Sequence, residues 1–257
     1  MVFVAQNLSF TVQKAKILKN VSMHIHEQEF VGLIGPNGSG KSTLLKNMYR
    51  MLKPQVGDVF LYNENIYKQS AKEMAKQLAV VGQETPVLFD FTVKDLVAMG
   101  RTPHKRLIEG DTKEDRDIIE QSMRQAGIVH LTERNFSSLS GGEKKRVIVA
   151  RALAQQAKIM VLDEPTNHLD VQHQLQLMDL IRSLPITVVV ALHDLNIAAT
   201  YCDKIYVMQN GEIMAYGTPQ DILTPAILKE VFGVHAEVSV HPITKKPHIF
   251  YIPEQFL

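Results

Sequence analysis

One stretch of this 257-residue chain combines closely spaced glycines with a lysine and a serine, a combination suited to binding phosphate. Residues 35–42 read GPNGSGKS, between an apolar run at residues 30–34 and a helical pattern of leucines. Glycines let successive backbone N–H groups converge on one anion, and the following helix adds its positive N-terminal end. Lys41 is expected to reach the β- and γ-phosphates of a nucleoside triphosphate, and Ser42 to hold Mg²⁺. The predicted binding residues are Gly35, Pro36, Asn37, Gly38, Ser39, Gly40, Lys41, Ser42 and Thr43.

A second motif places two acids at the end of an apolar strand, because residues 159–164 read IMVLDE. In open α/β sheets, ligand chemistry takes place at the carboxyl ends of the strands. Asp163 is therefore expected to hold the Mg²⁺, directly or through water. Glu164 is expected to polarise the attacking water as a general base. The alternative interpretation is an acidic cap on the helix that follows the strand.

The third motif, LSGGE at residues 139–143, predicts the start of a helix. Ser140 and Glu143 have the spacing of a capping box, in which each side chain binds the backbone N–H of the other residue. Gly141 and Gly142 would leave backbone N–H groups open to an anion from outside. Taken alone, a well-capped helix also explains the pattern.

The elements around these motifs alternate between strands and helices. Continuous apolar runs at residues 159–162 and 186–190 are typical of parallel strands that are covered on both faces. In residues 2–12 and 17–30, apolar and polar residues partly alternate, as is typical of strands. The Asn210-Gly211 pair predicts a hairpin turn.

Residues 92–158 have an almost entirely helical pattern, with helices expected over 93–99, 112–126 and 143–157. A helical block inside an alternating chain indicates an inserted lobe. The predicted fold is a single α/β phosphate-loop domain with a RecA-like core, an antiparallel β portion and an inserted helical lobe. Its expected parts are the core at 1–84 and 159–223, the lobe at about 85–158 and a C-terminal tail at 224–257.

Composition excludes some classes of function. The chain has 28 Lys and Arg against 27 Asp and Glu, so it offers no electrostatic case for nucleic acid as a partner. Its single cysteine, Cys202, excludes an internal disulfide and is expected to be a small core residue. We find no signal-peptide pattern and no apolar run near the roughly 20 residues that span a bilayer. Any membrane role is therefore expected to come through another chain.

The order of motifs resembles that of the nucleotide-binding subunit of an ATP-binding cassette (ABC) transporter, over nearly the whole chain. The matching positions are residues 35–42 (Walker A loop), Gln83 (Q-loop), 139–143 (signature), 159–164 (Walker B strand), Asp170 in NHLD (D-loop) and His193 (switch histidine). The signature is specific to this family, whereas a phosphate loop is shared with many others.

The resemblance implies a head-to-tail dimer of cassettes with two ATP molecules sandwiched between them. Each ATP would lie on the phosphate loop of one copy and meet the signature of the other copy. His193 would contact the γ-phosphate and hold Glu164 and the water in line. Gln83 would bind near Mg²⁺ and couple the helical lobe to the core, and Asp170 would link the two sites across the interface.

One position departs from the pattern of the family. Many members stack an aromatic ring on the adenine, and by spacing from Ile17-Leu18 this position falls on Val12. Adenine stacking is therefore expected to be weak, or to come from Phe10 or Phe3.

The resemblance also bears on the cargo. Intact Glu164 and His193 favour a hydrolysing cassette, and the lack of membrane-spanning segments favours a type II importer with separate subunits. MGRTPH at residues 99–104 and the tail around His241 resemble the importers of iron-siderophores, haem and cobalamin. The implied direct partner is a polytopic permease, which would dock on residues of about 83–106. A substrate-binding protein would be an indirect partner. The chain would lie peripherally on the cytoplasmic face of the membrane.

Two alternatives stay open: the ATPase of a zinc or manganese importer, and a soluble scaffold ATPase of iron–sulfur cluster assembly. DNA-repair cassettes are not favoured, because the region between phosphate loop and signature has no sustained heptads. The histidines of the tail match no compact ligand motif and are expected to be scattered surface residues. Lys144, Lys145 and Arg146 are expected to form the exposed face of the signature helix.

Overall fold

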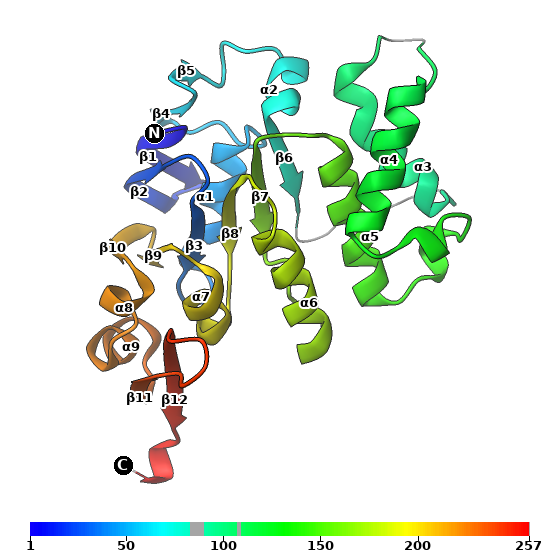
Figure 1. Cartoon of the computed structure of the whole chain (residues 1–257). Coiled ribbons are helices and arrows are strands. Elements are labelled where there is room, and N and C mark those ends of the chain that lie inside the picture. Colours follow the sequence, from blue (N-terminus) through cyan, green and yellow to red (C-terminus); the bar gives the residue numbers. More distant parts are fainter. Residues whose placement is uncertain (83–89, 107–108, 257) are drawn as a thin grey trace. The chain divides into compact units, whose positions relative to one another are not determined.

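The computed structural model describes residues 1–82, 90–106 and 109–256. The chain divides into two units, one made of residues 1–68 and 187–257 and the other of residues 69–186. Figure 1 shows the elements of both units.

An antiparallel sheet with the strand order β2-β1-β4-β5 begins the first unit. Its strands are β1 (Phe3–Val12), β2 (Ala15–Ile25), β4 (Val56–Leu61) and β5 (Glu64–Asn65). β2 ends earlier than the pattern over residues 17–30 predicts, because Gln28 takes a positive φ of 60° and a turn separates it from the next strand.

That next strand, β3 (Phe30–Ile34), pairs in parallel with β8 (Thr187–Ala191) and with β9 (Lys204–Gln209). Every residue of β3 and β8 is buried, as continuous apolar runs predict. β9 is joined to β10 (Glu212–Gly217) by the Asn210-Gly211 turn, where φ is 50° and 83°. Positive φ at both positions is the type I′ geometry that this pair favours, so the predicted hairpin is confirmed.

The first unit also contains short helices and a C-terminal hairpin (Figure 1). They are α1 (Lys41–Met48), α7 (Leu195–Tyr201), α8 (Pro219–Ile222), α9 (Pro225–Phe232), β11 (His235–Val240), β12 (Pro247–Ile252) and the 3₁₀ turn η4 (Glu254–Phe256). α8 and α9 each begin with a threonine cap followed by proline, which is a favoured helix start.

The second unit contains the parallel pair β6 (Leu78–Val81) and β7 (Ile159–Asp163) and most of the helices. The helices are α2 (Ala71–Gln77), α3 (Val93–Ala98), η1 (Met99–His104), α4 (Lys113–Gln125), η2 (Val129–Leu131), η3 (Phe136–Ser138), α5 (Gly141–Ala154) and α6 (Val171–Arg182). α5 begins two residues earlier than its periodicity predicts, because Ser140 is the cap. It also ends three residues earlier, and Gln156 beyond its end takes a φ of 53°.

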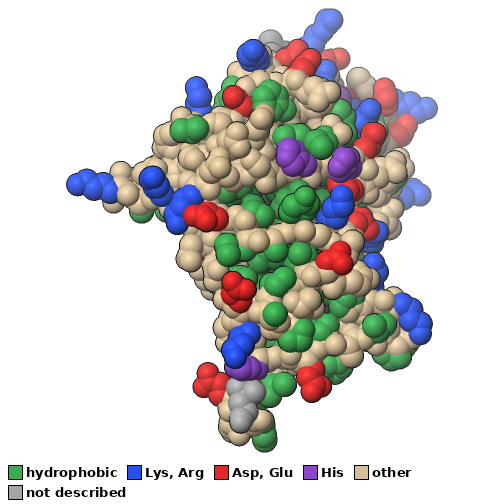
Figure 2. Space-filling model, turned by 90° about the vertical axis from the view of Figure 1, so that its left-hand side faces the viewer, with side chains coloured by type: hydrophobic (Ala, Val, Ile, Leu, Met, Phe, Trp, Pro, Cys, Tyr) green, Lys and Arg blue, Asp and Glu red, His purple; other side chains and the backbone are tan. Residues whose placement is uncertain are grey.

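The predicted fold class is confirmed: the chain is α/β, with parallel and antiparallel strands and a block of helices between β6 and β7. On the face drawn in Figure 2, basic and acidic side chains are interspersed. This agrees with a formal net charge of +1.

Candidate functional site

The phosphate loop joins β3 to α1 in the first unit. Gly35 and Gly40 take φ values of 154° and 104°, and a Cβ atom on Gly35 would lie only 2.1 Å from the carbonyl oxygen of Met208. The Lys41 ammonium donates to the carbonyl oxygens of Gly35 at 2.8 Å and of Pro36 at 3.1 Å. The loop therefore curls around the lysine, as a phosphate-binding loop must.

Ser39 supplies a further polar group inside this loop. The residue is 2% exposed, and its hydroxyl oxygen has no hydrogen-bond partner among the described residues. Leaving a buried hydroxyl unsatisfied costs about 1–3 kcal/mol, so such groups mark places that a ligand completes. The chemistry of the loop thus fits an oxygen-rich anion.

Asp163 and Glu164 lie at the carboxyl end of β7 in the second unit and are 1% and 7% exposed. Glu164 takes a φ of 52°, a conformation that costs a non-glycine residue on the order of 1–3 kcal/mol and is common at functional sites. The side-chain amide of Asn167 donates to the Glu164 carboxylate at 2.6 Å. The backbone turn and Asn167 together hold this carboxylate in one orientation.

Lys145 is a residue whose position sequence reasoning assigned wrongly. It lies in the second turn of α5 and is partly buried, as are Lys144 and Arg146, so the expected exposed face is not observed. The pKa of Lys145 is lowered, first because its ammonium is desolvated, while the charges of Asp163 and Glu164 act in the opposite direction. The Lys145 ammonium is therefore close enough to the two acids for their charges to act on its pKa. No local pattern could have revealed this, because the two segments are far apart in sequence.

The signature forms the predicted capping box at the start of α5. The Ser140 backbone N–H donates to the Glu143 carboxylate at 2.8 Å, and the Glu143 N–H donates to the Ser140 hydroxyl at 3.3 Å. The pKa of Glu143 is lowered first by the bond from the Ser140 N–H and second by the Ser140 hydroxyl, which donates to the same carboxylate at 2.8 Å. Gly141 is exposed, and a Cβ atom there would meet no atom of the described residues within 4 Å. The backbone at this helix start is thus open on the Gly141 side.

The D-loop aspartate, Asp170, caps α6 and accepts from the His173 backbone N–H at 2.9 Å. The His173 ring nitrogen Nδ1 lies 2.8 Å from the same carboxylate, and these contacts lower the pKa of Asp170. The His173 ring also packs on the signature, because a Cβ atom on Gly142 would lie 2.7 Å from its Cδ2. Sequence reasoning did not single out His173, although its spacing of three residues from a cap aspartate was a usable signal.

His193 lies between β8 and α7 in the first unit and is exposed. Directly after it, Asp194 caps α7, accepting from the N–H groups of Asn196 at 2.8 Å and Ile197 at 3.0 Å. Gln83, the predicted Q-loop residue, lies outside the described residues.

The aromatic candidates for adenine stacking differ in exposure. Phe3 is fully buried in β1, so the expectation that it could stack on adenine is wrong. Val12, at the end of β1, is 50% exposed, and Phe10 is partly buried.

The predicted site residues thus fall into two sets. The first unit contains the phosphate loop and His193, and the second contains the signature, Asp163, Glu164 and Asp170.

The MGRTPH motif forms η1 in the helical block. Arg101 is 5% exposed, and its Nε donates to Asp115 of α4 at 2.8 Å, while its Nη1 donates to the Ala154 carbonyl oxygen at 2.9 Å. Chiefly through the hydrogen bond from Arg101, the pKa of Asp115 falls to about 2. His104 Nε2 lies 2.9 Å from the Gln155 carbonyl oxygen. The motif therefore joins η1 to the C-terminal end of the helix that begins at the signature.

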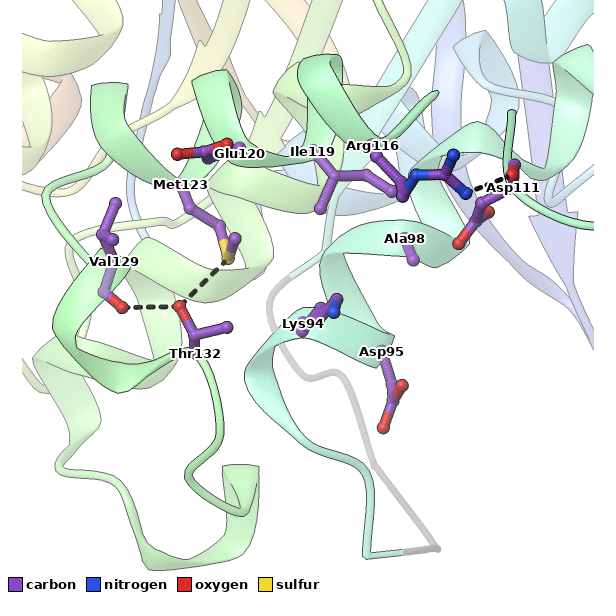
Figure 3. Close-up of a pocket in the computed structure, with 10 residues that line it drawn as sticks. All are labelled: Lys94, Asp95, Ala98, Asp111, Arg116, Ile119, Glu120, Met123, Val129 and Thr132. Atoms are coloured by element: carbon purple, nitrogen blue, oxygen red, sulfur yellow. Dashed lines mark hydrogen bonds between the residues drawn. The ribbon is translucent and has the colours of Figure 1, made fainter. Parts of the chain in front are cut away.

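A hollow of about 510 Å³ lies in the same block, mainly between α3 and α4 (Figure 3). Its lining residues are Lys94, Asp95, Ala98, Asp111, Arg116, Ile119, Glu120, Met123, Val129 and Thr132. Charged side chains of both signs and apolar side chains thus line this hollow together.

Comparison with known proteins identifies the family. Residues 18–167 match the family model described as ABC transporter, which covers more than half of the chain. The chain belongs to the ABC transporter family. The resemblance seen in the motifs is thereby confirmed, and the chain is an ABC ATPase cassette.

Relatives of this cassette are named as transport or import ATP-binding proteins. It is 35% identical to the ferric enterobactin transport ATP-binding protein of Escherichia coli, with 94% of this chain and 91% of that protein covered. It is 38% identical to the petrobactin import ATP-binding protein of Bacillus anthracis, with coverage of 99% and 91%. A cobalamin import ATP-binding protein of Halobacterium salinarum is 37% identical over 93% of this chain, and the chain spans 61% of the length of that relative.

Solved structures agree with this assignment. The cassette matches a transporter of the metal-chelate type, in an inward-facing conformation, with a TM-score of 0.86 and 26% identity over 100% of this chain and 99% of that one. It matches a dimeric bacterial ABC transporter cassette with a TM-score of 0.76 and 28% identity, over 84% and 98% of the two chains. Within the described part of the cassette, no helix is long and apolar enough to cross a membrane.

Proposed function

We propose that this cassette is the ATP-hydrolysing subunit of a type II ABC importer and drives uptake through a separate membrane permease. The observation that carries the proposal is the open, capped start of α5 at Ser140 and Gly141, in a chain that also has a phosphate loop. Glu143 accepts from Ser140, and the helix start is open beside it at Gly141, which suits an ATP held by a second copy.

Several motifs would share the work on ATP. The phosphate loop and Lys41 bind the β- and γ-phosphates, and the buried Ser39 hydroxyl adds a donor inside the loop. Glu164, oriented by Asn167, accepts a proton from the attacking water as general base. His193 contacts the γ-phosphate and keeps the water in line.

The oxygen donors of the chain fit Mg²⁺, a hard cation that prefers hydroxyl, carboxylate and amide oxygen ligands. Ser42 and the buried Asp163 would hold it, with Gln83 as a further ligand. When bound, Mg²⁺ neutralises charge on the phosphates.

The proposed assembly is a head-to-tail dimer in which the signature of one copy (Ser140, Gly141 and Gly142) meets the ATP on the phosphate loop of the other. Asp170 lies at the start of α6 and is bound to His173, whose ring packs beside Gly142. Asp170 would link the two ATP sites. A solved relative of this fold is a dimeric cassette, which supports the arrangement.

The permease would dock on the helical block around residues 83–106. The hollow beside α3 supports this assignment, because three of its lining residues, Lys94, Asp95 and Ala98, come from that segment. A substrate-binding protein would act indirectly, on the far side of the permease. The cassette would then lie peripherally on the cytoplasmic face of the membrane.

The proposed cargo is an iron-siderophore, haem or a cobalamin-like compound. The support is the identity of 35–38% to relatives named as ATP-binding proteins for the transport of ferric enterobactin or the import of petrobactin, hemin and cobalamin. No observation on this chain favours a zinc or manganese cargo or a scaffold role over this proposal.

The test is co-purification of the tagged cassette from detergent-solubilised native membranes. We expect a polytopic permease to copurify, and uptake assays with iron chelates, haem and cobalamin would then identify the cargo. Recovery of soluble partners alone, under conditions that preserve a known permease complex, would contradict the importer assignment.

A further inference from the structure

The C-terminal hairpin of β11 and β12 is a well-ordered element to which the proposed mechanism gives no role. Its strands pair in regular antiparallel register from His235 opposite Ile252 to Val240 opposite Pro247. The turn between them is closed by His241, whose Nδ1 accepts from two backbone N–H groups at 3.3 and 3.2 Å. The hairpin is therefore hydrogen-bonded both along its strands and at its turn.

The side chain of Asn196 in α7 is hydrogen-bonded to this hairpin. Figure 1 shows where α7 and the hairpin lie. The Asn196 amide donates from Nδ2 to the Ile249 carbonyl oxygen at 3.2 Å, and Oδ1 accepts from the Ile249 N–H at 2.8 Å. A side-chain amide can satisfy both groups of one residue in this way, just as a neighbouring strand would. Ile249 is 2% exposed, so both of its polar groups depend on Asn196 rather than on bulk water.

Asn196 stands three residues after His193, in the first turn of α7. The turn between them is fixed by Asp194, which accepts from the Asn196 N–H at 2.8 Å. Tyr251, two residues after Ile249, also lies near this turn: its pKa is raised by burial and, to a smaller extent, by the charge of Asp194. β12 thus reaches both the cap and the first turn of α7.

On its other side, His193 is also anchored. The Leu192 N–H donates to the Leu33 carbonyl oxygen at 3.0 Å, so the chain before His193 is attached to β3, the strand that leads into the phosphate loop. His193 therefore lies between two fixed points, one on β3 and one made by Asn196 with β12.

We propose that Asn196 is a positioning residue for ATP hydrolysis, which holds α7 on the C-terminal hairpin and thereby keeps His193 at a fixed position for the γ-phosphate. The proposal rests on the proposed function, in which His193 contacts that phosphate. A group misplaced by about 1 Å can lower a rate about 100-fold, so loss of one anchor has a measurable effect. ATP binding does not depend on this contact, because the phosphate loop is attached elsewhere.

The test is steady-state ATP hydrolysis by the full-length cassette with Asn196→Ala. We expect kcat to fall about tenfold with KM for ATP within about twofold, in line with loss of positioning rather than binding. The matched control is Thr200→Ala on the same helix, which removes a hydrogen bond from the Thr200 hydroxyl to the Asn196 carbonyl oxygen and leaves the hairpin contact intact. We expect kcat of this control to be unchanged.

A second measurement separates positioning from a general loss of structure. In a His193→Ala background, single-turnover hydrolysis should be no slower when Asn196→Ala is added, because Asn196 acts through His193. A further drop in that background would overturn the proposal, as would equal kcat values for Asn196→Ala and Thr200→Ala.

Two further outcomes are distinguishable. If Asn196→Ala does not fold, Asn196→Asp, which keeps the acceptor for the Ile249 N–H, replaces it in both comparisons with the same expected direction. If the unmodified cassette itself hydrolyses no ATP, the proposed function fails. If it hydrolyses ATP and Asn196→Ala has the same kcat as Thr200→Ala, only the role of Asn196 fails.

Discussion

The buried ion pair between Arg101 and Asp115 should make the stability of the helical block depend on pH. Both side chains are nearly buried, at 6% and 7% exposure. The pKa of Asp115 falls from 3.8 to about 2, foremost because Arg101 donates to its carboxylate and further because Thr112 does. At about 1.4 kcal/mol per unit, this shift corresponds to roughly 2 kcal/mol of unfolding free energy.

The sign follows from the direction of the shift. Because the pKa of Asp115 is lower in the folded chain than in the unfolded chain, its contribution is complete above about pH 4. It is lost as the pH falls towards 2. The difference in unfolding free energy between the unmodified cassette and Asp115→Asn should therefore shrink by roughly 2 kcal/mol from pH 5 to pH 2.

The assay is urea unfolding followed by circular dichroism at several pH values, with Glu120→Gln as the control on the same helix. Glu120 pairs with Arg124 one turn away, and both side chains are more than half exposed, so this pair should contribute only about 0.3–0.5 kcal/mol. Two results would refute the reasoning. One is a difference in unfolding free energy between Asp115→Asn and the unmodified cassette that does not change with pH. The other is a loss of unfolding free energy in Asp115→Asn no larger than that in Glu120→Gln.

Two further predictions concern the acids and the MGRTPH motif. Glu164→Gln should keep ATP binding and slow single-turnover hydrolysis about 10²–10⁴-fold, whereas Glu120→Gln should hydrolyse ATP at the unmodified rate. Equal single-turnover rates for Glu164→Gln and the unmodified cassette would show that Glu164 is not the general base. Gly100→Ala should destabilise the cassette by on the order of 3 kcal/mol, seen as a lower melting temperature, because its Cβ atom would lie 2.2 Å from the Arg151 carbonyl oxygen. Gly110→Ala, where a Cβ atom meets nothing within 4 Å, should melt like the unmodified chain.

Features that depend on neighbours in the sequence could be predicted from the sequence alone. The Ser140–Glu143 capping box and the Asn210-Gly211 turn are each determined by residues at most three positions apart. The buried strands β3, β7 and β8 could be predicted for a related reason, since a continuous apolar run has to be covered on both faces wherever it packs. The family assignment also followed from the order of such local motifs, and the match over residues 18–167 confirms it.

Exposure was harder to predict, because it depends on what packs against a residue. Phe3 had the right residue type for stacking on adenine, but it is fully buried in β1. Lys145 was expected on an exposed helix face and is instead partly buried near Asp163 and Glu164.

Only the tertiary structure decided which distant residues meet. Arg101 of the MGRTPH motif had no identifiable partner in the sequence, yet it binds Asp115 and the end of the signature helix. Asn196 binds Ile249, which lies 53 residues away. Sequence periodicity indicates which face of an element is apolar, but such pairings depend on how the elements pack. The sequence by itself therefore determined the local motifs that are predicted to bind phosphate, and the packing of elements decided which side chains hold them in position.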